Sequence, residues 1–459
     1  MARALKTIGL LDHLGCGNLG DDATLDAVMQ NIKSRCPGAR MIGLSLNPSD
    51  TYKRHGIPSH AIRRGLRVSP ESSQLVKARV KTILGNYRFL LSLLRAFNTI
   101  LITPKIVFHE LVFLVKSFRI AKSLDLLIIC GGGQLLDSWG GPWKFPFTLF
   151  KWVLLAKLSN ASCYVINVGA GPLSQPLSKW FIKWTLRLAD YVSFRDDKSR
   201  RLIQEIGYKV ERHVYPDNVY GLKIPNLIAS RDGKRREPIV GISPMAYCDP
   251  RVYWDQNKSV YDCYIQKLAP FGSWLIRNRH PLVLFSTELS FDSHAMEDFK
   301  SALAKDMGLG NSLRIEHEPI AAIEEMLSQM SSMEYVVTCR FHGVVFAHLL
   351  NIPVLAISHH PKVATLMNDL GLSEYCVDIS TFDFDQLTST FNRLVENRDD
   401  IKARMAKKVT CYQRQLEAQF DQLFCDDLTR KFRTGYPIAS DPGEQVGDQR
   451  ISEDINERI

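Results

Sequence analysis

The clearest chemical signal in the sequence is the run Arg340-Phe341-His342-Gly343, which follows the apolar, strand-like residues 335–338. An arginine can bind a carboxylate or phosphate through two parallel hydrogen bonds, and a histidine can exchange protons near neutral pH. A lone histidine is more often a structural residue, but its place beside an arginine at a strand end favours a functional interpretation. We therefore predict that Arg340 binds an anion and that His342 is catalytic.

Two more cations follow other predicted strands. Arg195 follows the strand-like residues 191–194, and Lys362 follows the apolar run 354–357. Cations at the carboxyl ends of parallel strands gather at one edge of a sheet, where a small anion carrying several negative charges would bind. An ion pair between Arg195 and a neighbouring aspartate is the structural alternative. The two consecutive histidines before Lys362 have no third ligand at a suitable spacing, so we predict no metal site.

Two glycine-rich loops supply a second kind of site. The first reads Gly17-Asn18-Leu19-Gly20-Asp21-Asp22, and the second contains Gly131, Gly132 and Gly133, followed by Asp137. Glycine permits a positive φ and a close approach of the backbone to a ligand. We predict that Asn18, Asp21 and the three glycines bind the hydroxyls of a sugar, and that Asp137 takes a proton from one of them. Capping of helix N-termini is the structural alternative for the acidic residues.

Alternating strands and helices must position these residues. Short apolar runs alternate with helical segments through residues 1–221 and again through residues 238–398. This pattern predicts an α/β protein of two Rossmann-like, doubly wound domains of the GT-B type with a cleft between them. The glycine-rich loops would make the first domain the side of a sugar acceptor, and Arg340, His342 and Lys362 would make the second the side of an anionic donor. Residues 222–237 would form the linker, residues 399–436 a C-terminal helix and residues 437–459 a disordered acidic tail.

The distribution of charge along the chain excludes some classes of function. The chain has 459 residues, 45% of them hydrophobic, and a net charge of +10. Residues 53–122 contain fourteen Lys and Arg and only two acids, so this insert carries the excess and the remainder is close to neutral. Such a distribution argues against nucleic acid as a partner. The insert is also rich in apolar residues, and two interpretations stay open: helices with a solvated basic face, or a surface for anionic membrane lipid.

The sequence also predicts where in the cell the protein is located. It lacks a secretory signal and any apolar segment long enough to cross a membrane, and its scattered cysteines include no Cys-x-x-Cys pair. These features predict a cytoplasmic protein with reduced cysteines. Binding of lipid by the basic insert would place it peripherally on the inner face of the membrane.

Together the motifs resemble those of the polysaccharide pyruvyl transferase family, in order and spacing, over most of the chain. The resemblance runs from the Gly17–Asp21 loop to Pro361-Lys362-Val363. It implies a GT-B-like fold, phosphoenolpyruvate as the donor substrate, and neither a metal nor another cofactor. Two positions differ: Phe341 stands where the family more often has Leu, and His359-His360 stands where it often has Tyr-Asp.

The resemblance further implies a role for each site residue. The implied reaction moves pyruvate from phosphoenolpyruvate onto a sugar of a glycan precursor as a cyclic ketal, and releases phosphate. His342 would be the acid and Asp137 the base. Arg195, Arg340 and Lys362 would hold the donor. Because Arg340 would then contact ligand and not core, its replacement is expected to spare the fold.

Two other functions fit parts of the sequence. A GT-B glycosyltransferase could use the same cations to bind the diphosphate of a nucleotide sugar. A non-catalytic scaffold of polysaccharide assembly would need only the basic insert, and the cluster of Arg195, Arg340, His342 and Lys362 argues against it. Stabilisation of the folded protein by its true donor distinguishes the two enzymes.

Overall fold

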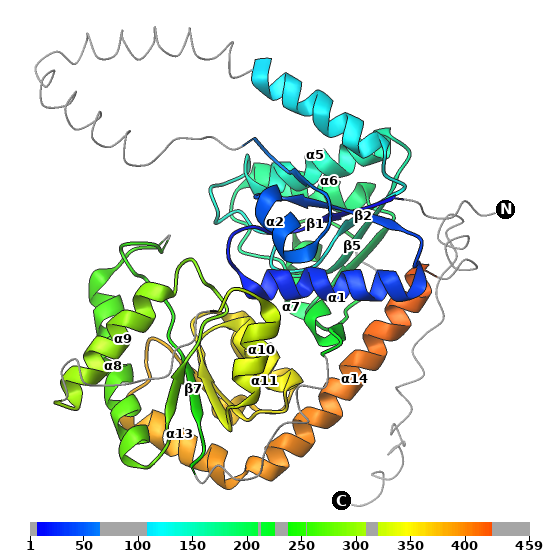
Figure 1. The fold of residues 1–459 in the computed structure, drawn as a ribbon. Helices are drawn as coiled ribbons and strands as arrows, with labels where there is room; N and C mark the ends of the chain where they lie inside the picture. The colour runs from blue at the N-terminus through cyan, green and yellow to red at the C-terminus, as the bar shows by residue number, and fades with distance from the viewer. Residues whose placement is uncertain are drawn as a thin grey trace, which may run out of the picture.

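The computed structural model describes residues 7–64, 108–209, 213–224, 237–253, 255–308 and 320–424. Within them, two parallel β-sheets with helices on both faces form two α/β domains, and the predicted fold class is confirmed (Figure 1). The first sheet has the strand order β3-β2-β1-β4-β5-β6, and the second has the order β11-β10-β9-β7-β8. Every strand pair in them is parallel, as alternation of strands and helices requires.

The first domain contains the elements that follow. Its strands are β1 (Thr7–Leu11), β2 (Arg40–Ser45), β3 (Ser59–Ala61), β4 (Leu126–Ile129), β5 (Ser162–Val168) and β6 (Tyr191–Phe194). Its helices are α1 (Leu19–Arg35), α2 (Pro48–His55), α5 (Phe145–Leu158), α6 (Pro176–Leu188), α7 (Asp197–Glu205) and the 3-10 helix η1 (Asn218–Gly221), and residues 108–122 are also helical.

Alternate side chains of the first sheet point into two separate cores, as the period of a strand requires. In β4, Leu127 and Ile129 pack with α5 and α6 on one face of the sheet. Leu126 and Ile128 pack with α1 and with the end of the C-terminal helix on the other face. The four apolar residues of this strand are therefore all buried, which explains their uninterrupted run in the sequence.

The second domain is built in the same way. Its strands are β7 (Val240–Ser243), β8 (Leu282–Leu284), β9 (Tyr335–Thr338), β10 (Val354–Ser358) and β11 (Cys376–Asp378). Its helices are α8 (Lys258–Arg277), α9 (Ser293–Asp306), α10 (Ile323–Ser331), α11 (Phe341–Leu349), α12 (Pro361–Asp369), η4 (Ser373–Tyr375), α13 (Phe384–Glu396) and α14 (Arg398–Phe424).

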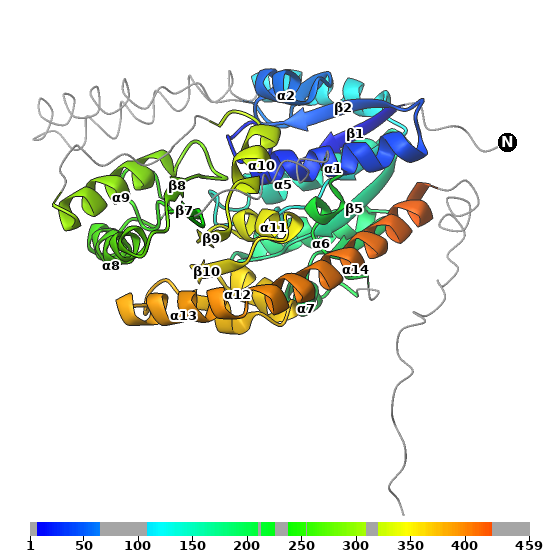
Figure 2. The same cartoon turned by 60° about the horizontal axis from the view of Figure 1, so that its bottom comes forward.

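Helix α14 leaves the second domain and ends against the first, which Figures 1 and 2 show from two sides. Near its end, buried Gln419 donates hydrogen bonds to Asn167 Oδ1 at 2.9 Å, Tyr191 Oη at 2.9 Å and Ser193 Oγ at 3.0 Å. These bonds satisfy a polar side chain inside a core and fix the helix on β5 and β6. The helix thus ties the two domains together.

Several sequence predictions fall outside the described residues. These are the greater part of the basic insert, most of the expected linker, the extension of the C-terminal helix beyond Phe424, and the acidic tail. Within the part of the chain that the structure describes, no helix combines the length and the apolar character needed to cross a bilayer.

Candidate functional site

The predicted cationic residues meet where the two domains face one another. The strands β6, β9 and β10 end just before Arg195, Arg340 and Lys362, so the carboxyl ends of both sheets deliver them to the same region. His342, in the first turn of α11, packs against Gly20 of the first domain. A Cβ atom on Gly20 would lie 1.8 Å from His342 Nδ1, so only glycine permits this contact.

Arg195 and Lys362 lie beside the ring of Phe341. The Arg195 Cζ atom is 4.4 Å from the ring centroid and the Lys362 Nζ atom is 5.9 Å from it. The ring face attracts both cations, which offsets part of their mutual repulsion. Burial and the nearby Arg195 and Arg340 lower the pKa of Lys362 to about 8. A small anion between these side chains would relieve the repulsion that lowers it.

Arg340 is already engaged by an aspartate that the sequence analysis missed. Its Nε atom donates to Asp292 Oδ2 at 2.8 Å, and its Nη2 atom donates to Asp292 Oδ1 at 2.5 Å. Asp292 is fully buried and also accepts hydrogen bonds from Ala246 N and Ser286 Oγ. This pair leaves Arg340 Nη1 as the donor available to a ligand. The sequence offers no signal for it, because Asp292 and Arg340 are far apart in the chain.

His342 faces charged groups of both signs. Burial lowers the pKa of His342, and the nearby Arg195 and Lys362 lower it further, against the opposing effects of Asp217 and Asp21. Its buried Nε2 atom has no hydrogen-bond partner among the described residues. An unpartnered buried nitrogen is uncommon and marks a position where a ligand atom can complete the contact.

The first glycine-rich loop makes the direct contact with the second domain. The Asn18 side chain caps α1, since Asn18 Oδ1 accepts from Gly20 N at 2.9 Å and from Asp21 N at 3.3 Å. Its backbone forms an antiparallel bridge with Glu288. Burial raises the pKa of Glu288 to about 8, and Asp292 and Asp21 add to this effect against the opposing one of Arg340.

Several carboxylates of the first domain surround this loop, and most of them have partners. Asp12 is buried and accepts from Gln134 Nε2 at 2.6 Å; burial and the neighbouring Asp21 raise its pKa well above the usual range. Asp217 accepts from Arg195 Nη1 at 3.1 Å. Asp21 has a side chain 10% exposed, and its oxygen lies 3.5 Å from His13 Nδ1. Of these three acids, Asp21 therefore accepts the fewest hydrogen bonds from other groups of the protein.

The second glycine-rich loop lies next to Asp21 of the first. Gly131 and Gly132 have φ values of 98° and 67°, a region that favours glycine, and a Cβ atom on Gly131 would lie 2.7 Å from Asn218 Nδ2. A Cβ atom on Gly132 would be 3.7 Å from Asp21 Oδ1. Gly133 faces open space. The structure thus brings this loop next to Asp21, as the predicted acceptor site requires.

Asp137 occupies a different environment from the other predicted residues. Its Oδ2 atom accepts from Gln175 N at 2.8 Å and from Ser174 N at 3.0 Å, at the start of α6. Although burial raises it, these hydrogen bonds bring the pKa of Asp137 below the usual value. These bonds fix the two residues just before α6, so Asp137 has a structural role at the entry to this helix, close to the capping role that the sequence left open.

The two histidines before Lys362 have structural contacts. His359 Nδ1 lies 2.9 Å from Cys339 O, and His360 Nδ1 accepts from Lys362 N at 3.3 Å at the start of α12. Within the described ranges, no group of three or more His, Cys, Asp or Glu side chains is placed to hold a metal ion.

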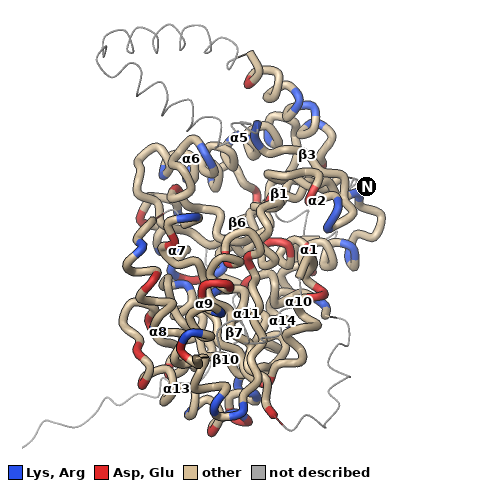
Figure 3. The backbone as a smooth tube through the Cα atoms, turned by 60° about the vertical axis from the view of Figure 1, so that its left-hand side comes forward, with Lys and Arg blue, Asp and Glu red and all other residues tan. Residues whose placement is uncertain are grey.

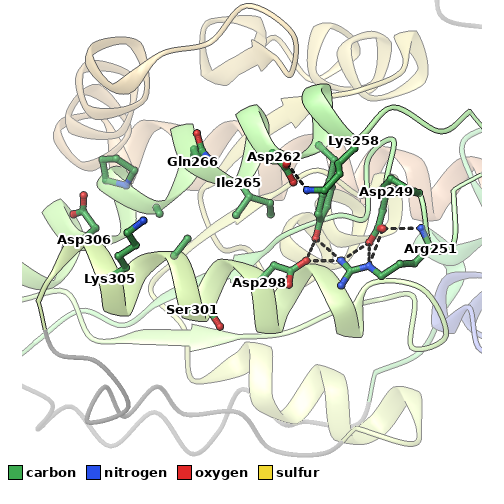
Figure 4. Close-up of a pocket in the computed structure, with 15 residues that line it drawn as sticks. Asp249, Arg251, Lys258, Asp262, Ile265, Gln266, Asp298, Ser301, Lys305 and Asp306 are labelled. Carbon is green, nitrogen blue, oxygen red and sulfur yellow. Dashed lines mark hydrogen bonds and ion pairs between the residues drawn. The ribbon is translucent and has the colours of Figure 1, made fainter.

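A large surface cavity lies away from this region, between α8 and α9 (Figure 4). Most of its charged side chains are paired with one another, Lys305 and Asp306 being outside these pairs. Arg251 bonds to Asp249 at 2.7 Å and also to Asp298, and Lys258 bonds to Asp262 at 2.5 Å. Because these charges already satisfy each other, we place the candidate site at the domain interface and not here.

A family model described as polysaccharide pyruvyl transferase matches residues 18–361. The chain belongs to the polysaccharide pyruvyl transferase family. The matched region includes the Gly17–Asp21 loop from Asn18 onward, the three glycines, Arg195 and the Arg340–His342 pair, so the resemblance read from these motifs is confirmed.

The chain is also similar to a curated protein in sequence and to solved structures in fold. Amylovoran biosynthesis protein AmsJ of Erwinia amylovora is 19% identical over 418 residues, which cover 87% of this chain and 94% of that protein. In fold, the chain is similar to S. aureus MnaA in its co-structure with UDP, with a TM-score of 0.54, 10% identity and coverage of 94% and 99% of the two chains. A putative UDP-N-acetylglucosamine 2-epimerase from Listeria monocytogenes gives a TM-score of 0.53, 10% identity and coverage of 95% and 99%.

Proposed function

We propose that this pyruvyl transferase family member transfers pyruvate from phosphoenolpyruvate to two hydroxyls of one sugar, forming a cyclic ketal in a polysaccharide precursor. The observation that carries the proposal is the cluster of Arg195, Lys362 and His342 around Phe341, opposite Asp21. Phosphoenolpyruvate has a carboxylate and a phosphate, which are complementary to the cations of this cluster. Arg195 is already paired with Asp217 and with its neighbour Asp196, whereas Lys362 makes no ion pair within the described residues.

His342 is the proposed acid. It protonates the methylene carbon of phosphoenolpyruvate, which makes the adjacent carbon an electrophile for a sugar hydroxyl. The carbon–oxygen bond to phosphate then breaks, and a second hydroxyl of the same sugar closes the ring. The two hydroxyls lose two protons in total: one balances the proton given to carbon, and the other leaves with phosphate. Arg195 and Lys362 stabilise the departing charge.

Asp21 is the proposed base, in place of Asp137. Both residues follow glycine-rich loops, but Asp137 already accepts two backbone hydrogen bonds at the start of α6. Asp21 lies in the first turn of α1, which touches His342 through Gly20, and Gly132 approaches it from the neighbouring loop. A sugar bound over these glycines would have a hydroxyl within reach of Asp21 and the donor on the side of His342.

Donor choice and product together test the proposed function. The protein is incubated with phosphoenolpyruvate or with a UDP-sugar, alone and with a panel of lipid-linked and nucleotide-linked sugars. We expect thermal stabilisation by phosphoenolpyruvate, release of phosphate that depends on the acceptor, and a product heavier than the acceptor by one pyruvate ketal. Stabilisation by a UDP-sugar alone, with transfer of its sugar, would replace the proposal with glycosyl transfer.

The lowered pKa of Lys362 leads to a prediction of how the affinity for the donor changes with pH. Its pKa of about 8 in the free protein means that it is cationic below this pH and neutral above it. An anionic donor binds the cationic form better, so affinity is expected to fall about tenfold per pH unit as the pH rises above 8. In Lys362→Arg the charge persists, and affinity should stay level to higher pH.

Calorimetric titration with phosphoenolpyruvate above pH 7 measures this change, because the phosphate is then already ionised. The same Kd for the wild type on both sides of pH 8 would remove Lys362 from the donor site.

A further inference from the structure

One face of the first domain exposes an unusual number of aromatic side chains. We call it the aromatic face, and define it by residues of α5, α6 and the turn before α5: Trp143, Phe147, Phe150, Leu177, Trp180 and Trp184. Trp143 is 65% exposed, Trp180 47% and Trp184 37%. Tryptophans are normally well buried, so three of them in water on adjacent helices call for an explanation.

These rings form a continuous surface. Trp143 lies 5.4 Å from Phe147, and Trp180 lies 5.4 Å from Phe150 and 6.1 Å from Trp184, measured between ring centroids. Phe181 lies beneath them and contacts Trp143 and Trp180. The exposed rings are thus held in place by packed neighbours and form one patch spanning both helices.

The charge of this part of the chain has a single sign. Residues 138–188 contain six Lys and Arg and neither Asp nor Glu, so α5 and α6 in Figure 3 carry blue segments and no red ones. Lys144 precedes α5, Lys179 lies in the first part of α6, and Arg187 in its last turn. The Arg187 Cζ atom lies 5.4 Å from the Trp184 ring. Cations therefore border the exposed rings.

The neighbouring helix, residues 108–122, also exposes large apolar side chains. Phe108 is 63% exposed, Leu111 55% and Val115 51%. The segment contacts α5, because the Lys151 Nζ atom lies 4.6 Å from the Phe113 ring. Together these helices expose apolar and cationic side chains at the surface of the first domain.

We propose that the aromatic face docks on the surface of an anionic lipid bilayer. Tryptophan prefers the membrane–water interface, where its ring is in an apolar layer and its N–H group reaches water. Lys and Arg beside it attract anionic headgroups. A second copy of this chain is a poor partner for the face, because Lys144, Lys179 and Arg187 border the rings, residues 138–188 contain no acid, and these cations would repel those of another copy. The helices lie on the membrane without crossing it.

Docking in this way would orient the candidate site. Helices α5 and α6 both begin at the carboxyl edge of the first sheet, the edge that also carries the glycine-rich loops. Trp139, next to the aromatic face in sequence, packs against His13 with ring centroids 4.4 Å apart and the rings tilted by 37°, and His13 Nδ1 lies 3.5 Å from Asp21. A lipid-carried sugar would thus reach Asp21 from the membrane side. This last step rests on the proposed function, whereas the docking itself does not.

Co-sedimentation with vesicles tests the docking without any assay of activity. The full chain is mixed with vesicles of phosphatidylcholine and phosphatidylglycerol, or of phosphatidylcholine alone, at low and high salt. We expect binding only to the anionic vesicles, weaker at high salt because salt screens the attraction. Tryptophan fluorescence should be quenched by brominated acyl chains in the bound protein.

The test variant is Lys144→Glu with Lys179→Glu. Both positions lie at helix N-termini, where an acidic side chain is favourable, so the fold is expected to survive. Loss of two attractive charges and gain of two repulsive ones should lower the partition coefficient more than about tenfold. The matched control, Lys305→Glu with Lys407→Glu, makes the same change in net charge at exposed positions of the second domain and of α14, and should bind as the wild type does.

A second variant, Trp143→Ala with Trp180→Ala, tests the apolar contribution and should also lower binding and remove most of the quenching. Equal loss of binding in the control variant would mean attraction by net charge and would overturn the proposal. So would wild-type protein that stays in the supernatant at low salt. A wild type that instead forms dimers, dissociated by the tryptophan substitutions, would assign the face to a second copy of the chain.

Discussion

Replacing His342 by asparagine is expected to lower kcat by a factor of about 10²–10⁴ while leaving the Kd for phosphoenolpyruvate within a few-fold of the wild type. Asparagine retains a polar side chain of similar reach but cannot deliver a proton near neutral pH, and general acid catalysis typically contributes a factor of this size. Burial and neighbouring cations lower the pKa of His342 in the free protein. Binding of an anionic donor raises it again, so the protonated acid forms when the donor is present.

Calorimetry in buffers of different ionisation enthalpy detects this coupling. The wild type should take up protons as the donor binds, and His342→Asn should take up fewer.

Two matched variants test the base. Asp21→Asn is expected to lower kcat, whereas Asp137→Asn is expected to lower thermal stability through the weakened contact with α6. Wild-type turnover in His342→Asn would rule out His342 as the acid. A large loss of kcat in a folded Asp137→Asn would show that Asp137, and not Asp21, is the base.

Replacing Arg340 by alanine is expected to destabilise the protein itself, by about 3–5 kcal/mol in the free energy of unfolding. The substitution leaves the carboxylate of Asp292 buried at 0% exposure without its cation, close to Glu288. This reverses the expectation from sequence that removing Arg340 spares the fold. Denaturant unfolding of the protein without substrate gives the measurement.

The double variant Arg340→Met with Asp292→Leu separates stability from binding. Replacing a buried ion pair by apolar side chains of similar size is often neutral for stability, so this variant should recover much of the loss. It should still bind phosphoenolpyruvate more weakly than the wild type, because Arg340 Nη1 is gone. If Arg340→Ala unfolds at the wild-type denaturant concentration, the Asp292 contact does not support the fold.

The sequence predicted the sheets well because their strands are apolar and end at glycine or polar residues. The predicted strand 191–194 agrees with β6, and 335–338 with β9, to the residue. The short edge strands β3 and β11 were missed. Each is three residues long and only partly buried, so neither produces the apolar run that marks a central strand.

The candidate site was predictable only in part. Residues at the ends of strands, such as Arg195, Arg340 and Lys362, were found because the fold brings the ends of parallel strands together. The partners that decide what these residues can do were not: Asp292, bound to Arg340, and Ser174 with Gln175, bound to Asp137, come from other segments. Sequence spacing carries no information on such contacts, which depend on tertiary packing.

Phe341 shows how a difference from the family pattern can be understood once the structure is known. Where the family more often has Leu, the aromatic ring lies between Arg195 and Lys362 and attracts both. A cation next to a ring face is stabilised by about 0.5–2 kcal/mol. The ring thus helps to hold two like charges close together before a donor arrives.

The contact between the domains has a thermodynamic consequence for substrate binding. Leu19 N donates to Thr287 O at 2.9 Å, Leu289 N donates to Gly17 O at 2.8 Å, and Ser290 Oγ donates to Cys16 O at 2.7 Å. Separation of the domains breaks all three bonds at once, so the closed and open arrangements are distinct states. In the proposed function, donor and acceptor would bind on opposite sides of this junction, and each would make its full set of contacts only in the closed arrangement. Each ligand is therefore expected to raise the affinity for the other by the same factor, giving positive cooperativity within a single chain.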